Sequence, residues 1–218
     1  MPLGIIIFSR MKSTRLPGKA MLDFGGMPLV EHVIRRAQKT GYPVILATSD
    51  TKEDDVLEEL ANKIGINCFR GSEDNVLERA VLAAEAYGLS AFARLCGDRP
   101  FFSVDEMRSF LELWNSKTEN DRPDLITNNY PHKAIRGLTT EVIKTSTLKS
   151  ILETSPTQDE KEHLTLRFSN RPELYNIVSI KSDFKGIDKS LGYAVDTEED
   201  YNRALQRIEE ISNSSLKG

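Results

Sequence analysis

The chain has 218 residues, of which 39% are hydrophobic, and it carries a formal net charge of −4 at pH 7. This length suffices for one large core, and the hydrophobic content excludes a disordered chain. Because the chain is acidic overall and no excess of basic residues dominates it, the composition argues against a nucleic-acid polymer as partner. The two cysteines, Cys68 and Cys96, lack metal-site spacing and fit a cytoplasmic protein. No apolar run is long enough for a membrane span, so we expect no membrane partner.

A cationic loop follows the first predicted strand. Residues 3–8 form an apolar run typical of a buried strand, and the loop over 9–19 carries four cations, Arg10, Lys12, Arg15 and Lys19. In open α/β sheets, ligands bind at the carboxyl ends of the strands. Small residues there leave backbone N–H groups accessible to an anion. The loop therefore predicts a pocket for several phosphates, such as a nucleoside triphosphate, and the alternative is a solvated basic loop.

The loop does not match the common phosphate-binding motifs. A Walker A motif needs Ser or Thr after Gly-Lys, and here Gly18-Lys19 is followed by Ala20. The spacing Gly-x-Gly-x-x-Gly is absent as well. Both P-loop kinase chemistry and dinucleotide binding are therefore disfavoured.

Strand and helix patterns alternate through the first half of the chain. After the first strand, the periodicity predicts helices over 27–40, 53–64, 75–87 and 103–114, and strands over 44–47, 66–69 and 91–95. Ser103 and Glu106 have the spacing of a capping box at the start of the last of these helices. Repeated β-α-β units predict a Rossmann-like, doubly wound α/β fold with a mostly parallel sheet.

The pattern changes after residue 121. Strands are predicted over 124–127, 138–143 and 173–180, and helices over 145–154, 157–171 and 198–211. We interpret the chain as a single α/β domain, 1–218, with an inserted lobe at about 130–190.

Two aspartates are candidate metal ligands. Asp98 comes directly after the strand over 91–95, and Asp196 follows the apolar residues 193–195, which we interpret as another strand end. Triphosphate chemistry usually requires a divalent cation, and Mg²⁺ prefers carboxylate oxygens. The alternative is structural: Asp98 could fix a turn before Pro100, and Asp196 could cap the last helix.

These motifs, taken together and in this order, resemble the sugar cytidylyltransferases, which include the CMP-Kdo synthetases and the acylneuraminate cytidylyltransferases. The SpsF-like branch, linked to spore-coat polysaccharide, is the most similar. The matching segments are 10–19, 25–29, 47–50, 69–74, 97–98, 162–165 and 195–200. Lys12 and Arg99 depart from the pattern of that branch and add positive charge beside the phosphates.

The resemblance implies an enzyme that binds CTP and Mg²⁺, joins CMP to a sugar-acid hydroxyl for surface polysaccharide biosynthesis, and releases pyrophosphate. It places the metal on Asp98 and Asp196 and assigns catalytic roles to Arg15, Lys19 and Asp98. The nucleotide-binding positions that it implies are Ser9, Arg10, Ser13, Arg15, Lys19, Thr48, Asp50 and Arg70. Glu141 and His163 fall on candidate substrate positions.

The resemblance also implies a homodimer that pairs through the lobe. Its apolar residues Val142, Ile143, Ile177 and Val178 would otherwise face water. Two further readings of the function stay open. One is a nucleotidyltransferase that uses another nucleotide or a polyol-phosphate acceptor. The other is a nucleotide-binding regulatory protein that has lost catalysis.

Overall fold

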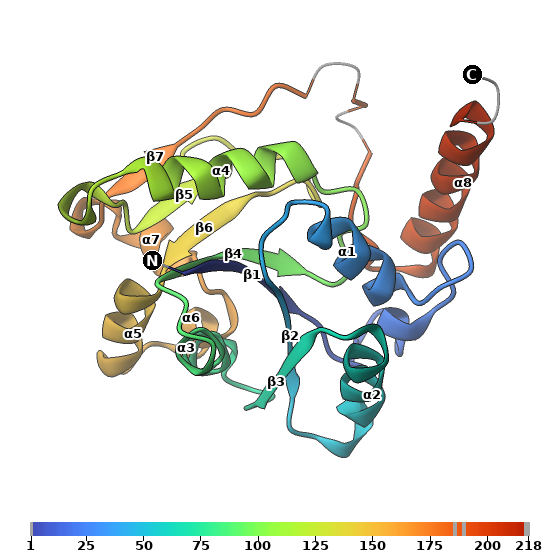
Figure 1. Cartoon of the computed structure of the whole chain (residues 1–218), viewed down its shortest axis with the longest axis horizontal. Helices are drawn as coiled ribbons and strands as arrows, with labels where there is room; N and C mark the ends of the chain where they lie inside the picture. The colour runs from blue at the N-terminus through green and yellow to red at the C-terminus, as the bar shows by residue number, and fades with distance from the viewer. Residues whose placement is uncertain (1, 185–186, 189–190, 216–218) are drawn as a thin grey trace.

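A computed structural model describes residues 2–184, 187–188 and 191–215 of the chain. Within these residues, seven strands form one sheet in the order β3-β2-β1-β4-β6-β5-β7 (Figure 1). Strand β6 runs antiparallel to both of its neighbours, and the other pairs are parallel. The strands are β1 (Leu3–Phe8), β2 (Val44–Ser49), β3 (Asn67–Gly71), β4 (Ala91–Cys96), β5 (Leu125–Thr127), β6 (Glu141–Lys144) and β7 (Ile177–Ser179). The predicted Rossmann-like, mostly parallel sheet is confirmed.

Helices cover both faces of this sheet. They are α1 (Leu29–Gln38), α2 (Asp55–Ile64), α3 (Val76–Ala86), α4 (Val104–Ser116), α5 (Thr145–Glu153), α6 (Gln158–Glu162), α7 (Leu166–Asn170) and α8 (Glu198–Ser215). Helices α1, α2 and α4 share one hydrophobic cluster, and α3, α5 and α7 share the cluster on the opposite face. In Figure 1, α4 lies above the sheet and α3 and α5 lie below it. Across the described residues, no helix is both long and apolar enough to cross a bilayer.

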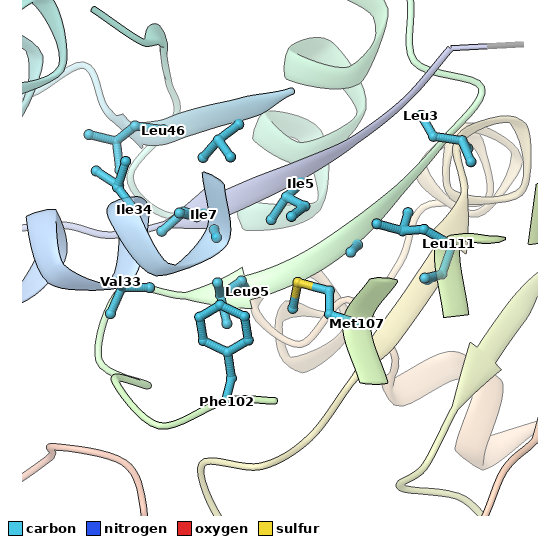
Figure 2. Packing of buried hydrophobic residues seen from close by; sticks show 14 of the residues in the cluster. Leu3, Ile5, Ile7, Val33, Ile34, Leu46, Leu95, Phe102, Met107 and Leu111 are labelled. Atoms are coloured by element: carbon cyan, nitrogen blue, oxygen red, sulfur yellow. The ribbon is translucent and has the colours of Figure 1, made fainter. Parts of the chain in front are cut away.

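The two clusters follow from the alternation of side chains along β1. Leu3, Ile5 and Ile7 point toward α1 and α4, where they meet side chains such as Ile34 (Figure 2). Ile6, between them, packs in the cluster on the other face. Burying each such side chain contributes about 1.5–3 kcal/mol to folding. This continuous burial holds the end of β1 in place, and with it the start of the cationic loop.

A third, smaller cluster joins α8 to the start of α1. Phe24, Leu29, Val195 and Ala204 are its buried members. The segment before α8 also crosses close to Gly137, where a Cβ atom would lie 2.2 Å from the carbonyl carbon of Tyr193. Gly137 has φ +90, so glycine is favoured there on both grounds. This packing brings the chain ahead of α8 back to the end of β4.

The predicted helix over 157–171 is wrong as a single element. It divides into α6 and α7, and the break contains His163. A capping box starts α6, because Thr157 accepts from the backbone N–H of Glu160 and the Glu160 carboxylate accepts from the backbone N–H of Thr157. The break was missed because periodicity alone does not report a change in chain direction.

The capping box predicted at Ser103 is only half formed. The Ser103 hydroxyl accepts from the backbone N–H of Glu106 at 3.1 Å. The Glu106 carboxylate turns instead to the hydroxyl of Thr140, at 2.9 Å, and to the side-chain amide of Asn128, at 3.2 Å. Glu106 therefore ties α4 to the segments beside β5 and β6.

Residues 130–190 contribute β6 and β7 to the same sheet as the first four strands. Val142 and Ile143 are fully buried there, and Ile177 and Val178 pack against the two main clusters. The expectation that these four residues form an exposed apolar surface is wrong. They are sheet residues, and the apolar pattern in β6 is that of a strand covered on both faces.

Candidate active site

A cleft of about 390 Å³ lies at the carboxyl ends of β1 and β4. The chain passes from β1 to β2 on one side of β1, whereas β4 lies on its other side, and ligands bind at such a switch point. Gly97 brings the two strand ends together, since a Cβ atom there would lie 2.8 Å from the Ser9 hydroxyl oxygen. Eight predicted site residues line the cleft: Ser9, Arg10, Ser13, Arg15, Lys19, Asp98, His163 and Asp196.

Lys19 is the centre of the charged groups in this cleft. Its ammonium lies 2.6 Å from Asp98 Oδ2 and 3.0 Å from Asp196 Oδ1, and it donates to the Val195 carbonyl at 3.0 Å. Burial alone would lower the pKa of Lys19, but the two carboxylates outweigh it and raise the pKa. The Lys19 ammonium therefore stays charged throughout the neutral range.

Asp196 lies in the loop ahead of α8 and not at the end of a strand, so that part of the prediction is wrong. Besides Lys19, it pairs with Arg15 at 3.2 Å and with Arg136. Burial would raise its pKa, but Lys19 and Arg136 lower it overall. Its backbone N–H donates to the carboxylate of Asp200, which orders the loop. Asp196 is thus held ionised by two cations of the cationic loop, Arg15 and Lys19, and by Arg136.

The donor set of Asp98 and Asp196 fits a divalent cation. Two carboxylates converge on one positive group, the Lys19 ammonium, and carboxylate oxygens are the ligands that Mg²⁺ prefers. Within the described residues, no group of three or more His, Cys, Asp or Glu side chains is arranged to hold a metal. Mg²⁺ usually keeps several waters and binds through one or two carboxylates plus substrate phosphates. Two aspartates are therefore enough for an ion that arrives with a nucleotide.

The remaining loop cations, Arg10 and Lys12, are themselves exposed and form only weak ion pairs. Arg10 lies 3.9 Å from Glu73 and 4.0 Å from Glu162. Lys12, whose side chain is 73% exposed, pairs with Glu73 at 3.1 Å. Exposed pairs of this kind contribute about 0–1 kcal/mol. Both cations can therefore turn toward a bound anion at little cost.

Asp54 positions the loop, and the sequence reasoning missed it. Its Oδ1 accepts from the backbone N–H of Met11 at 2.7 Å, and its Oδ2 accepts from the Thr48 hydroxyl at 2.7 Å and from Ser49. Burial would raise the pKa of Asp54, but these hydrogen bonds lower it. Thr48, predicted to bind nucleotide, is therefore buried in this network and outside the cleft lining. A carboxylate five residues beyond the end of β2 gave no signal of such a contact.

Asp50 and Arg70 also lie outside the cleft lining. Arg70 donates to the backbone carbonyls of Ser49 and Thr51, at 3.1 Å and 2.7 Å. It also pairs with two carboxylates of α2, Asp55 at 2.6 Å and Glu58 at 2.9 Å. Asp50 is exposed at the end of β2. The structure does not bring these two residues together with the cationic loop.

Two arginines were missed, although both line the cleft: Arg79 of α3, which is buried, and Arg94 of β4, which is largely buried. Burial and the nearby Arg10 lower the pKa of Arg79 to about 10. Arg94 pairs at 2.9 Å with Glu141, which does not line the cleft and also accepts from the Thr165 hydroxyl at 3.0 Å. A charged residue inside the apolar run of β4 was the available signal for Arg94.

Comparison with known proteins identifies the family of the chain. The model of the family described as cytidylyltransferase matches residues 4–214. The chain belongs to the cytidylyltransferase family. It is similar to the spore coat polysaccharide biosynthesis protein SpsF of Bacillus subtilis, with 31% identity over 203 residues, which cover 90% of this chain and 82% of SpsF.

Solved structures show the same cytidylyltransferase fold. A cytidylyltransferase from Leptospira borgpetersenii superposes with a TM-score of 0.85 and 25% identity, covering 98% of this chain and 96% of that one. A CMP:2-keto-3-deoxy-manno-octonic acid synthetase complexed with CTP gives a TM-score of 0.73 at 18% identity, covering 96% and 99%. The resemblance seen in the sequence motifs is confirmed, and this cytidylyltransferase is an enzyme of the nucleotidyltransferase class.

Proposed function

We propose that this cytidylyltransferase joins CMP from CTP to a hydroxyl of a sugar acid and releases pyrophosphate, as a step in making a surface polysaccharide. The observation that carries the proposal is the convergence of Lys19, Asp98 and Asp196 at the switch point of the sheet, beside the cationic loop. The name of the CMP:2-keto-3-deoxy-manno-octonic acid synthetase supports the acceptor class, and that of SpsF supports the link to polysaccharide.

In this reaction the acceptor hydroxyl oxygen attacks the α-phosphorus of CTP, and the bond from that phosphorus to the β-phosphate oxygen breaks. The hydroxyl proton passes to solvent, and pyrophosphate leaves with the electron pair. Positioning and charge stabilisation are the protein's tasks in such a transfer. Lys19, Arg15 and Arg10 face the cleft with charges that match a triphosphate.

Lys19 has a second role in the proposal, because it occupies the two carboxylates before nucleotide binds. Phosphate oxygens would attract its ammonium away from Asp98 and Asp196. Those two aspartates would then hold Mg²⁺, which supplies charge neutralisation at the phosphates when bound. The exchange keeps each carboxylate paired with a cation in both states, which avoids leaving a buried charge uncompensated.

Release of pyrophosphate tests the function. The wild-type enzyme is incubated with CTP and Mg²⁺ and with a panel of sugar acids, including 3-deoxy-manno-octulosonate and N-acetylneuraminate, and of polyol phosphates. We expect acceptor-dependent release with at least one sugar acid, and much less with ATP, GTP or UTP. Turnover with polyol phosphates alone would assign another acceptor class. Tight CTP binding without release for any acceptor would indicate a regulatory protein.

The homodimer stays a proposal that rests on the resemblance, since the apolar residues first used to argue it are buried in the sheet. We expect a mass of twice 24.5 kDa by light scattering at micromolar concentration. A mass of 24.5 kDa would remove both the dimer and any role of His163 in a neighbour's site.

A further inference from the structure

Arg94 is a largely buried cation that lines the cleft, separate from the loop cations. It lies in β4, where its register partners are Ile6 of β1 on one side and Glu141 of β6 on the other. Its side chain is 17% exposed and lines the cleft. The loop cations lie beyond the strand ends, whereas Arg94 comes two residues before the end of β4. The cleft therefore has an outer and an inner positive end.

Glu141 satisfies only part of the Arg94 guanidinium. The contact joins Arg94 Nη1 to Glu141 Oε2, and the Thr165 hydroxyl holds the other oxygen of Glu141. The buried Nε of Arg94 has no hydrogen-bond partner among the described residues. A guanidinium presents its donors as a planar fork that matches a carboxylate in a bidentate manner. Glu141 and Thr165 thus fix the orientation of a fork whose Nε donor is unused.

The pair of Arg167 and Glu160 shows what a purely structural pair looks like in the same molecule. Glu160 accepts from both Nε and Nη2 of Arg167, and the Thr154 hydroxyl accepts from Nη1. Neither member lines the cleft. The Nε, Nη1 and Nη2 donors of Arg167 are all used within the protein, whereas the Nε donor of Arg94 has no partner among the described residues.

We propose that Arg94 binds the carboxylate of the acceptor and so selects an anionic sugar as the substrate. The proposal rests on the proposed function, in which the acceptor is a sugar acid. A triphosphate and a sugar acid repel each other, so placing them side by side needs a separate cation for each. The outer cations match the triphosphate, and Arg94, farther along the cleft, matches the second anion.

The first test is kinetic and uses the conservative variant Arg94→Lys, which keeps the charge that Glu141 requires. With a sugar acid that the wild type turns over, we expect kcat/KM for the acceptor to fall about 10- to 100-fold, the range of one charged hydrogen bond. The KM for CTP should change less than about twofold. With the carboxamide of the same sugar, wild type and variant should be equally slow.

Arg167→Lys is the matched control, because it makes the same change in a buried arginine–glutamate pair outside the cleft. It should leave the acceptor kcat/KM and the preference for acid over amide unchanged. An equal loss on acid and amide acceptors by Arg94→Lys would mean that Arg94 only supports the fold. That result, or no loss at all, overturns the proposal.

The second test needs no turnover. Protein labelled with ¹⁵N-arginine and bound to CTP is titrated with N-acetylneuraminate, with 3-deoxy-manno-octulosonate and with a polyol phosphate, and the Arg94 Nε–H resonance is assigned through Arg94→Lys. A shift with at least one sugar acid supports the proposal. No shift with either acid, or a shift only with a polyol phosphate, overturns it. Absence of pyrophosphate release in the wild type would overturn the proposed function, and the resonance would still decide the role of Arg94.

Discussion

Two cations near the carboxyl edge of the sheet, Lys19 after β1 and Arg70 in β3, differ in how their partners are arranged. Arg70 donates to two backbone carbonyls and two carboxylates of its own neighbourhood, and it lies outside the cleft lining. Lys19 bridges Asp98 and Asp196, which come from segments 98 residues apart, and all three line the cleft. The partners of Arg70 lie in its own neighbourhood, whereas Lys19, which also donates to one backbone carbonyl, that of Val195, is held mainly by two cleft carboxylates that a ligand can replace.

The difference shows why a cation at a strand end does not by itself mark a site. Backbone carbonyls cannot exchange partners without loss of local structure, so an arginine bound to them is fixed. Carboxylates that face a cleft can take a metal ion in place of an ammonium. An ion pair marks a site when each member can also bind a ligand: here the ammonium can bind phosphate, and the carboxylates can bind a metal ion.

The largest effect should come from Asp98→Asn. It removes one negative charge from the group of Lys19, Asp98 and Asp196, the Lys19 cluster, and keeps the side-chain size. We expect kcat/KM to fall by at least about 100-fold, because an electrostatic group at the reacting phosphate is lost. The activity should also respond less to added Mg²⁺. Turnover measured across a Mg²⁺ titration checks this result. Full activity at limiting Mg²⁺ would make Asp98 a turn former and would remove the contrast with Arg70.

Lys19→Ala should come next, with a loss in kcat/KM for CTP of at least about tenfold, or 1.4 kcal/mol. Arg15→Ala provides the matched comparison, because Arg15 is 62% exposed and has one contact with Asp196 at 3.2 Å. It should lose about tenfold in CTP use with unchanged stability. Steady-state kinetics and thermal unfolding separate the two variants. Wild-type kinetics in both would contradict the triphosphate site.

The sequence could predict the sheet and the outer cations, because both follow from local patterns. Buried β1 and the density of charge after it indicate a ligand loop without any knowledge of tertiary contacts. The roles of Asp54 and Arg94 could not be predicted from such patterns. Asp54 acts through the backbone of Met11, 43 residues away, and Arg94 meets Glu141 only because β6 pairs with β4. Long-range pairing decides which charged residues meet.

A smaller effect on activity is expected from Arg70→Ala, which tests the other member of the comparison. The variant should lose about 1 kcal/mol of stability, since two backbone carbonyls lose a donor and the two ion pairs are partly exposed. Its kcat/KM should stay within about threefold of wild type. Urea unfolding and steady-state kinetics measure the two quantities. A large rise in the KM for CTP at normal stability would show that Arg70 reaches the nucleotide.

The smallest effect on activity at neutral pH is expected from Asp200→Asn. The Asp200 carboxylate accepts from the backbone N–H of Asp196 and so helps to hold the Lys19 cluster in place. Burial would raise the pKa of Asp200, but Arg136 and the loop hydrogen bonds lower it to about 2. A folded-state pKa below the unfolded value stabilises the protein above pH 4, and this contribution is lost as the pH falls toward 2. Removing it should cost about 1–2 kcal/mol.

Urea unfolding of wild type and Asp200→Asn between pH 6 and pH 2.5 measures this contribution directly. The stability difference between the two proteins should be largest above about pH 4 and should shrink as Asp200 becomes protonated in the folded wild type. Glu160 also has a pKa of about 2 and titrates in the same pH range. Taking the difference in unfolding free energy between wild type and variant cancels its contribution, because Glu160 is present in both. A difference that stays constant with pH would mean that Asp200 acts through packing and that the charge of the Lys19 cluster does not depend on it.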